Sequence, residues 1–226
     1  MHKKKPLFIT FEGIEGSGKS YQSQKLFKKL KTHGYNTVYT REPGGSLGAE
    51  QIRKVILTGS KNKFLPVTDT LLYLAARNEH INKLIIPSLK KKKIIICDRF
   101  IDSTLSYQVY GKRVSKKLVN IIHKEILKNI KPDLTFILKL NISKALKRIN
   151  KRGYKNRYDM LGRNFYNTVQ KSFVKIGREN KNRCIVLDST KDTKDIENFI
   201  FKKVIEYIKK WKMKIQISNY WTPRNN

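Results

Sequence analysis

The sequence has few acidic residues, little cysteine and no long apolar stretch. Its 226 residues include 17 Asp and Glu against 50 Lys and Arg, which gives a formal net charge of +33. No apolar run approaches the ~18 residues that a transmembrane helix needs, so we expect no membrane span. The apolar stretch near the N-terminus, Leu7 to Phe11, is also too short for a secretory signal peptide.

The scarcity of cysteine argues against a disulfide-stabilised secreted protein. The two cysteines, Cys97 and Cys184, each lie inside an apolar run. A thiol in such a run is usually buried and unpaired, as in proteins of a reducing compartment. We therefore expect two buried free thiols and a cytoplasmic location.

The positive charge has two competing explanations. So basic a chain is first a candidate for binding nucleic acid or an anionic membrane. However, lysine carries the excess, with 38 Lys against 12 Arg, and Lys, Asn and Ile are all abundant. These three residues have A/T-rich codons, so a biased base composition accounts for much of the charge. Because 39% of the residues are hydrophobic, the chain has enough apolar surface for a folded core. We expect no specific nucleic-acid partner and no membrane partner.

Short runs of branched and aromatic residues alternate with amphipathic segments along the chain. Strands are predicted at residues 7–11, 36–40, 94–97, 134–138 and 184–187. Helices are predicted at about residues 19–32, 68–89, 115–129, 143–151, 163–179 and 193–212. This alternation predicts an α/β domain with a five-stranded parallel sheet covered by helices on both faces. We expect one domain over residues 1–214 and a loose C-terminal tail over residues 215–226.

A glycine-rich segment follows the first predicted strand and opens the first predicted helix. It matches G-x-x-x-x-G-K-[ST] with Gly13, Ile14, Glu15, Gly16, Ser17, Gly18, Lys19 and Ser20. In such a loop, backbone N–H groups turn inward on phosphate oxygens, and the helix N-terminus adds a positive dipole. We expect the P-loop NTPase fold with a nucleoside triphosphate site, Lys19 bridging the β- and γ-phosphates and the Ser20 hydroxyl ligating Mg²⁺.

An acidic residue at the end of the third predicted strand completes the expected metal site. Asp98 follows the apolar run 94–97, and a carboxylate beside a phosphate loop can hold Mg²⁺ directly or through water. A switch GTPase would also carry an N-K-x-D motif that reads the base. The sequence has no such motif, so a signalling GTPase is disfavoured.

Arginine is scarce against the lysine background, so its positions are informative. A planar, bidentate grip on phosphate requires Arg rather than Lys. The candidates for phosphate or base contacts are Arg41, Arg53, Arg77, Arg99, Arg148, Arg152 and Arg157. The alternative is that some arginines are ordinary surface residues, which we expect of Arg113, Arg163, Arg178 and Arg183.

The motifs together resemble those of the bacterial thymidylate kinases, over roughly Leu7 to Ile208. They are F-E-G-I-E-G-S-G-K-S at 11–20, T-R-E-P-G-G at 40–45, A-A-R at 75–77, D-R-F at 98–100 and P-D-L-T at 132–135. The resemblance implies ATP-dependent phosphorylation of dTMP to dTDP, for dTTP biosynthesis, with Mg²⁺ and in a homodimer. The alternatives are another nucleotide or deoxynucleoside kinase, or a basic nucleic-acid-binding P-loop ATPase.

The resemblance also implies roles for individual residues. Lys19, Arg99, Arg157 and Glu15 are the implied catalytic residues, and Ser20 and Asp98 the metal ligands. For the phosphate and sugar of dTMP, it implies that Arg53 and Arg99 hold the phosphate, that Glu42 lies near the acceptor and that Glu15 lies near the 3′-hydroxyl. For the base, it implies that Tyr73 stacks on thymine and that Arg77 donates to O4. Thr104 and Gln108 are implied at the edge of the base, with Ser103 and Tyr107 beside them. A tyrosine such as Tyr107 near the sugar would exclude a 2′-hydroxyl.

A basic segment at about residues 148–160 resembles the family's lid. It contains Arg148, Arg152 and Arg157. Family members with a non-basic residue after the acidic position of the phosphate loop carry a catalytic arginine in the lid. Gly16 occupies that position here, so the resemblance implies Arg157 in this role; the alternative is a solvated basic loop. The sequence departs from the family pattern at Tyr21, Val109, Lys139, Asn156 and Asp159.

Overall fold

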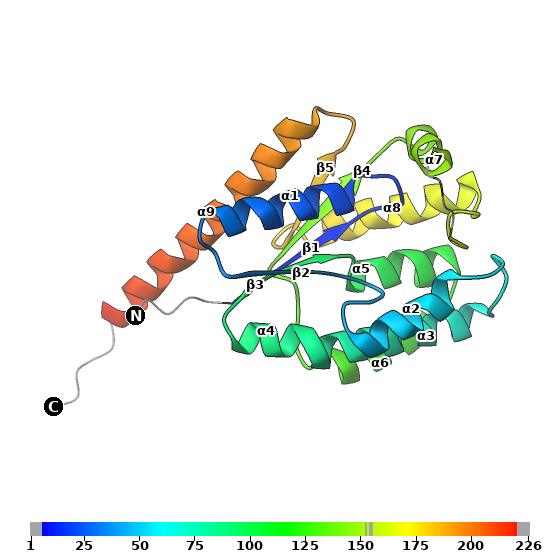
Figure 1. Cartoon of the computed structure of the whole chain (residues 1–226), viewed down its shortest axis with the longest axis horizontal. Coiled ribbons are helices and arrows are strands. Elements are labelled where there is room, and N and C mark those ends of the chain that lie inside the picture. The colour runs from blue at the N-terminus through cyan, green and yellow to red at the C-terminus, as the bar shows by residue number, and fades with distance from the viewer. Residues whose placement is uncertain (1–5, 152, 154–155, 221–226) are drawn as a thin grey trace.

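The five predicted strands form one sheet in which all neighbouring strands are parallel. The computed structural model describes residues 6–151, 153 and 156–220, with side chains described up to residue 210. The strands are β1 (Leu7–Glu12), β2 (Thr37–Arg41), β3 (Ile94–Asp98), β4 (Leu134–Lys139) and β5 (Cys184–Asp188), in the order β2-β3-β1-β4-β5 (Figure 1). The prediction of a five-stranded parallel sheet is confirmed.

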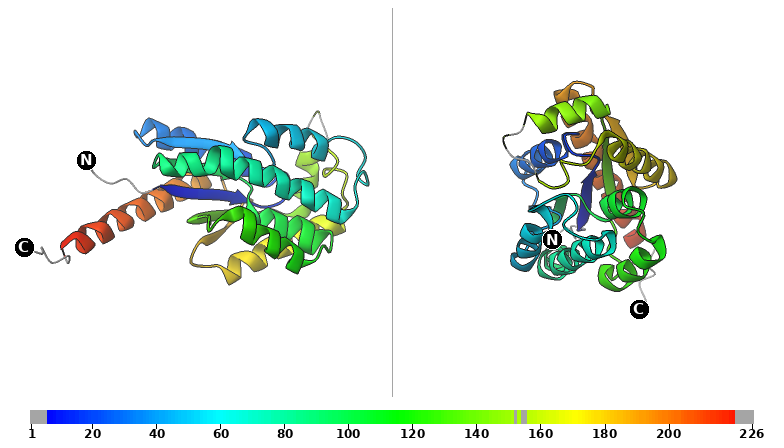
Figure 2. Two further views of the ribbon diagram at one scale, coloured as in Figure 1. Left: turned by 90° about the horizontal axis from the view of Figure 1, so that it is seen from below. Right: turned by 90° about the vertical axis from the view of Figure 1, so that its right-hand side faces the viewer.

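Helical segments connect the strands and cover both faces of the sheet (Figure 2). They are α1 (Lys19–Thr32), α2 (Leu47–Leu57), α3 (Pro66–His80), the π-helical turn η1 (Ile81–Ile85), α4 (Ile86–Lys90), α5 (Ile101–Thr104), the π-helical segment η2 (Leu105–Gly111), α6 (Lys116–Leu127), α7 (Ile142–Asn150), α8 (Arg163–Glu179) and α9 (Thr193–Tyr220). The sequence reasoning missed α2 and the α5–η2 segment as helices. It also ended the last helix too early: α9 continues to Tyr220, so residues 215–220 of the expected tail are helical. No glycine or proline interrupts the chain between Thr193 and Tyr220, and the next proline is Pro223.

The alternation of side chains along β1 divides the core between the two faces. Leu7, Ile9 and Phe11 point to one face, where α1 and α9 cover them. Phe8 points to the opposite face and packs with Ile81 and Ile85 from η1. On that second face, α8 contacts β4 and β5 and belongs to a third apolar cluster. This arrangement matches the continuous apolar runs of buried parallel strands.

Both cysteines are buried and free, as expected from the sequence. Arg183, which we expected on the surface, instead donates to both carboxylate oxygens of the fully buried Asp102, at 2.8 and 2.9 Å. This pair lies beside a buried hydrogen bond between Thr10 and Thr135, since Arg183 also donates to Thr135 at 3.0 Å. None of the helices that the structure describes has both the length and the apolar character of a bilayer span.

The sheet brings the candidate motifs to one edge. The register pairs Phe11 with Asp98 and Arg41 with Asp98, so β1, β3 and β2 end at the same level. The segments that follow these strands are the glycine-rich loop, the Arg99 turn and the T-R-E-P-G-G turn. In a parallel α/β sheet, the carboxyl edge of the strands is the usual place for a ligand.

Candidate active site

The glycine-rich loop has the backbone conformation that phosphate binding requires. Gly13 has φ +136° and Gly16 has φ +73°, both in the region that favours glycine. A Cβ on Gly13 would lie 2.4 Å from the carbonyl oxygen of Leu138, so no larger residue fits there. The loop leads directly into the N-terminus of α1, whose first residue is Lys19. Its amides and the helix dipole therefore face the same space.

Lys19 is folded back onto its own loop. Its Nζ donates to the carbonyl oxygen of Ile14 at 2.7 Å, and the side chain is buried. Burial and the neighbouring Arg99 lower the pKa of Lys19 to about 8. An incoming phosphate would reverse this shift, because its negative charge favours the ammonium form.

Ser20 and Asp98 meet beside the loop, as the sequence predicts. The Ser20 hydroxyl donates to Oδ2 of Asp98. Oδ1 of the same carboxylate is buried and has no hydrogen-bond partner among the described residues. Such an orphaned oxygen fits a metal ion or a metal-bound water, and hydroxyl and carboxylate oxygens are suitable Mg²⁺ ligands. No group of three or more His, Cys, Asp or Glu residues in the described part of the chain forms a metal cage, so a metal here would depend on nucleotide phosphates for further ligands.

A cavity of about 420 Å³ opens at this edge of the sheet. It is lined by every residue that the resemblance assigns to dTMP, together with Gly16, Lys19, Ser20 and Asp98. The dTMP set is Glu15, Glu42, Arg53, Tyr73, Arg77, Arg99, Ser103, Thr104, Tyr107 and Gln108. Residues that are far apart in the chain thus share one space large enough for a nucleotide.

Arg99 holds the phosphate loop and the η2 segment together at one end of the cavity. Its Nη2 donates to Glu15 at 2.8 Å and its Nη1 to the carbonyl oxygen of Gly13 at 3.0 Å. The hydroxyl of Tyr107 donates to the other oxygen of Glu15. Burial by itself raises the pKa of Glu15, but Arg99 and Lys19 outweigh it, and the pKa lies below its ordinary value. Arg99 also has φ +73°, an uncommon conformation for a non-glycine residue that is typical of functional sites.

Glu12, at the end of β1, fixes the turn that carries Arg99. Its Oε1 accepts from the backbone N–H of Phe100 at 2.8 Å, and its Oε2 lies 2.5 Å from the Ser103 hydroxyl oxygen. The carboxyl group is fully buried. Burial and the nearby Asp102 raise the pKa of Glu12 to about 8. Glu12 therefore supports the site from behind and does not line the cavity.

Glu42 and Arg77 form a buried ion pair in the wall of the cavity. Nε of Arg77 donates to Oε2 of Glu42 at 2.8 Å. His80 donates from Nδ1 to Oε1 of Glu42 at 3.0 Å, because the carboxylate can only accept, and its Nε2 lies 2.7 Å from the Thr40 hydroxyl oxygen. Burial by itself raises the pKa of Glu42, but Arg77 and His80 hold it below its ordinary value.

The T-R-E-P-G-G turn positions Arg53. Nη1 of Arg53 donates to the carbonyl oxygen of Pro43 at 2.6 Å. The turn itself needs glycine: Gly45 has φ +88°, and a Cβ there would lie 2.3 Å from the Thr40 hydroxyl oxygen. Arg53 comes from α2, the helix that sequence reasoning missed, so its placement depends on that helix.

Three tyrosine side chains form part of the cavity wall. The ring of Tyr73 meets that of Tyr158 edge-on at 5.7 Å, and Tyr107 meets Tyr158 at 6.1 Å. Gln108 donates to the Tyr158 hydroxyl at 3.4 Å. Tyr158 and Asn156 both line the cavity, so part of the predicted lid segment belongs to its wall.

The structure places the lid arginines in different surroundings. Arg148, on α7, donates from Nη1 to the carbonyl oxygen of Gly16 at 2.9 Å and so touches the phosphate loop. Arg157 is buried and does not line the cavity. Its Nη1 donates to Asp69 at 2.6 Å and to the carbonyl oxygen of Ile56 at 3.0 Å. Arg152 lies outside the described residues.

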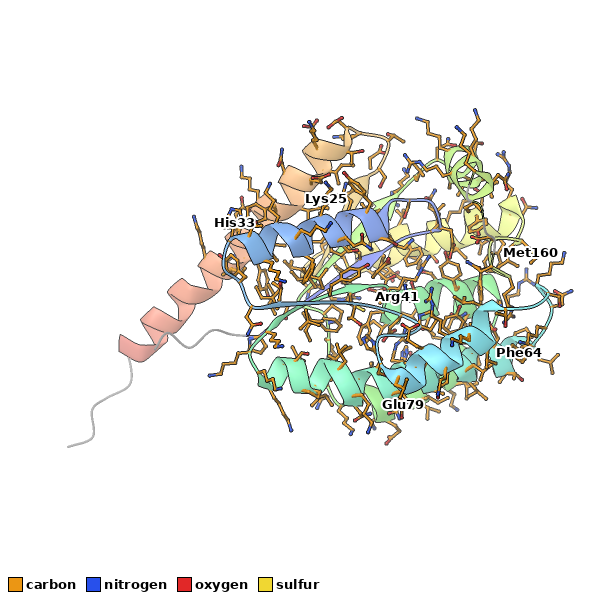
Figure 3. All side chains as sticks on the ribbon, in the orientation of Figure 1. Lys25, His33, Arg41, Phe64, Glu79 and Met160 are labelled. Atoms are coloured by element: carbon orange, nitrogen blue, oxygen red, sulfur yellow. The ribbon has the colours of Figure 1, made fainter. Side chains whose placement is uncertain are left out.

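Figure 3 labels Phe64 and Met160 at the same end of the molecule. The guanidinium carbon of Arg157 lies 5.2 Å from the centre of the Phe64 ring, so Arg157 is packed into this end. Arg41, also labelled in Figure 3, pairs with Glu50 at 3.4 Å and lines the cavity near its mouth.

Sequence reasoning missed three residues that hold the site from behind. Asp69 accepts from Arg157, from Lys112 at 2.7 Å and from the Tyr158 hydroxyl. His80 and His123 contact the Glu42–Arg77 pair. No local sequence signal marks them, because each partner lies 35 or more positions away in the chain.

Comparison with known proteins agrees with the motifs and the site. The family model described as "Thymidylate kinase" matches residues 11–200. The thymidylate kinase of Wolbachia pipientis wMel is 44% identical over 204 residues, which cover 88% of this chain and all of that protein. That of Mycoplasma capricolum is 40% identical over 206 residues, covering 90% and 96%. The crystal structure of thymidylate kinase from Ehrlichia chaffeensis superposes with a TM-score of 0.72 at 34% identity, covering 88% of this chain and 98% of that one.

The fold, the phosphate loop and the cavity agree with one family, and the family model covers most of the chain. The chain belongs to the thymidylate kinase family.

Proposed function

We infer that this protein transfers the γ-phosphoryl group of ATP to dTMP, giving ADP and dTDP. The observation that carries the inference is the single cavity in which the phosphate loop, two arginines and an aromatic wall face one another. A phosphate loop alone leaves the acceptor open. The arginines and the aromatic wall fit a nucleoside monophosphate, since one end is cationic and the other can stack on a base.

The acceptor phosphate would bind between Arg53 and Arg99. Both guanidinium groups line the cavity, and both are oriented by backbone carbonyls, those of Pro43 and Gly13. Two oriented guanidinium groups hold an anion in one position, and in-line phosphoryl transfer depends mainly on such positioning and on charge stabilisation. Lys19 would leave the Ile14 carbonyl and turn to the transferred group.

The base would lie against Tyr73, with Arg77 at its polar edge. Thr104 and Gln108 line the same region. Tyr107 and Glu15, joined by a hydrogen bond, would face the sugar. In this arrangement, Glu15 accepts from the 3′-hydroxyl, and the Tyr107 ring leaves no room for a 2′-hydroxyl.

Ser20 and Asp98 would hold Mg²⁺, whose chemistry is to neutralise charge on the phosphates and orient them. The orphaned Oδ1 of Asp98 supports this assignment. Of the lid arginines, Arg148 already touches the phosphate loop. For Arg157 to act on the transferred group, it would have to leave Asp69.

We further propose that two copies of the chain associate through α2 and α3. These two helices pack together. α2 carries the exposed apolar side chains of Leu47 and Val55, α3 carries those of Val67 and Leu71, and Leu65 immediately precedes α3. Several large apolar side chains exposed on one helix pair are typical of a surface that a partner covers. The buried free thiols support a cytoplasmic location. Light scattering should report a dimer for the wild type and a monomer for Leu71→Glu, and a monomeric wild type would contradict the proposal.

The acceptor preference tests the proposed reaction directly. ADP release should be measured with dTMP, dUMP, dCMP, dGMP and thymidine at equal concentrations. We expect dTMP to give the highest kcat/KM and Lys19→Ala to abolish turnover. A preference for another acceptor would refute the assignment. The rival reading, a nucleic-acid-dependent ATPase, predicts stimulation by DNA or RNA in the absence of dTMP.

A further inference from the structure

A buried carboxyl group lies directly behind the cavity and contacts one of the residues that line it. Glu12 has no exposed surface, and its Oε2 lies 2.5 Å from the hydroxyl oxygen of Ser103. Its Oε1 accepts from the backbone N–H of Phe100 at 2.8 Å and from that of Ser103 at 3.3 Å. Ser103 lines the cavity, whereas Glu12 does not. The Ser103 side chain is therefore the contact through which Glu12 reaches the cavity.

Glu12 has no ion-pair partner among the described residues, although two arginines lie nearby. Arg99 pairs with Glu15 at 2.8 Å, and Arg183 pairs with Asp102 at 2.8 Å. Asp102 is fully buried and acts on Glu12 as a like charge. Burial and Asp102 raise the pKa of Glu12 to about 8, because the opposing effect of Arg99 is smaller. At neutral pH the group is therefore mostly a carboxylic acid.

Three further ionisable groups lie within electrostatic range of Glu12. They are Lys19 on α1 and the thiols of Cys97 on β3 and Cys184 on β5. The Lys19 ammonium group donates to the carbonyl oxygen of Ile14. Burial raises the pKa of both thiols, so both are neutral at physiological pH. None of the three is in hydrogen-bond contact with the carboxyl group, and none replaces the missing ion-pair partner.

The proton on Glu12 determines the direction of the Ser103 hydroxyl. A hydroxyl group has one proton to donate and two lone pairs that accept. Nη1 of Arg99 donates to one of these lone pairs at 3.1 Å. If Glu12 is ionised, its carboxylate takes the Ser103 proton, and only a lone pair is left for the cavity. If Glu12 is neutral, it donates its own proton to the second lone pair, and the Ser103 proton is free to point into the cavity.

A donor at this place suits an anionic ligand. Phosphate oxygens are acceptors, so a lone pair of Ser103 would repel them, whereas the Ser103 proton would bind them. The negative charge of the phosphate would in turn raise the pKa of Glu12 further. The phosphate and the proton on Glu12 therefore favour each other's binding.

We propose that Glu12 is a positioning residue that acts as a neutral carboxylic acid, donating to Ser103 and so turning the Ser103 hydroxyl toward an oxygen of the acceptor phosphate. The proposal rests on the proposed function, in which that phosphate binds beside Arg99. Glu12 itself does not touch the nucleotide. No proton is transferred, because Glu12 keeps its proton in the hydrogen bond. Loss of that proton at alkaline pH turns Ser103 from a donor into an acceptor and weakens acceptor binding.

The test uses a variant that imitates the neutral form at every pH. In Glu12→Gln, the amide oxygen still accepts from Phe100 and the amide N–H donates to Ser103. Ser103→Ala removes the hydroxyl group. Glu125→Gln, the same exchange at an exposed position on α6, is the control. For each protein, calorimetry should give the dissociation constant of dTMP from about pH 7 to about pH 9.5, together with the melting temperature. In the free wild type, the NMR signal of the Glu12 carboxyl carbon, assigned by its absence in Glu12→Gln, reports the proton directly.

In the wild type and in Glu125→Gln, the dissociation constant of dTMP should rise by about tenfold over this range, the loss of one charge-assisted hydrogen bond. Glu12→Gln should match the wild type at about pH 7 and stay within about twofold of that value at alkaline pH. Ser103→Ala should bind about tenfold more weakly already at about pH 7 and show no further rise. Parallel pH profiles of the wild type and Glu12→Gln would overturn the proposal. So would a tenfold loss of affinity at about pH 7 in a folded Glu12→Gln, since it would show that the ionised carboxylate is needed.

The NMR titration needs no substrate, so it separates this proposal from the proposed function. A Glu12 carboxyl signal that titrates with a midpoint below about pH 7 would overturn the proposal for any acceptor. A wild type whose Glu12 titrates near pH 8 but which binds no dTMP would instead refute the proposed function, and with it the acceptor named here.

Discussion

Asp69 is a buried carboxylate whose replacement should lower the stability of the folded protein. It accepts from Arg157, from Lys112 and from the Tyr158 hydroxyl, and its side chain has no exposed surface. The change Asp69→Asn keeps the size of the side chain and removes its charge. Lys112 is 13% exposed and can turn toward water, whereas the Arg157 side chain is 1% exposed and cannot.

The loss in unfolding free energy therefore comes mainly from Arg157. Its Nη1 would keep the carbonyl oxygen of Ile56 and at best a neutral amide oxygen in place of the carboxylate, and its Nη2 already lacks a hydrogen-bond partner among the described residues. Leaving one member of a buried ion pair without its partner costs about 3–5 kcal/mol. For a chain of this length, that corresponds to a fall in melting temperature of about 6–20 °C.

A double-mutant cycle separates this cost from other effects. Urea unfolding should be measured for Asp69→Asn, Arg157→Met and the double variant. Because the double variant no longer contains an unpaired buried cation, it should be more stable than the sum of the single changes predicts, by about 1–3 kcal/mol. Additive changes within about 0.5 kcal/mol would refute the reasoning. The same variants test the lid: if Arg157→Met lowers kcat by orders of magnitude without a matching loss of stability, Arg157 acts on the transferred group.

Two further predictions concern pH. At about pH 8 the free enzyme holds Lys19 partly deprotonated, and phosphates raise its pKa, so ATP binding should take up a proton. Calorimetry in two buffers of different ionisation enthalpy should show this uptake, and Lys19→Met should remove it; equal heats for the wild type would contradict it. For Glu12, burial and Asp102 raise the pKa from 4.5 to about 8 in the folded chain. Its contribution to stability is therefore complete below about pH 4.5 and is lost as the pH rises to about 8. Glu12→Gln should flatten the decline of the unfolding free energy between pH 5 and 8, and slopes parallel to wild type would show that Glu12 does not titrate in this range.

The strands and the phosphate loop were predictable because their signals are local. An apolar run such as residues 94–97 can only be buried on both faces, and the glycine-rich motif fixes where α1 begins. The helix at Arg163–Glu179 has the bounds expected from its periodicity. By contrast, residues 101–111 contain β-branched, hydroxyl and aromatic side chains with low helix propensity, and they form a partly π-helical segment. Tertiary contacts with α8 hold this segment in place, and no local pattern contains them.

The candidate site also contains residues that a local sequence signal marks and residues that no such signal marks. Many of the residues that line the cavity belong to compact motifs, and the resemblance that those motifs carry grouped them in the sequence. The residues that orient them do not: Asp69 and Arg157 are 88 positions apart, and Arg77 and His123 are 46 apart. Sequence alone also could not tell that the half-buried Arg183 pairs with the buried Asp102 or that Arg157 faces Asp69, because an arginine on a surface and one in such a pair look alike in sequence.

The connection that follows β4 touches both halves of the cavity. Arg148 donates a hydrogen bond to the phosphate loop at Gly16. Tyr158, ten residues further along, lines the cavity and donates a hydrogen bond from its hydroxyl to Asp69 on α3. One connection between β4 and α8 thus supplies a contact to the phosphate loop and a contact to Asp69. Coupling between two binding sites is reciprocal. If the donor nucleotide changes the dissociation constant of the acceptor by some factor, the acceptor changes the dissociation constant of the donor by the same factor. Measuring the dissociation constant of each nucleotide with and without the other, in the wild type and in Asp69→Asn, therefore tests whether this connection couples the two halves of the cavity.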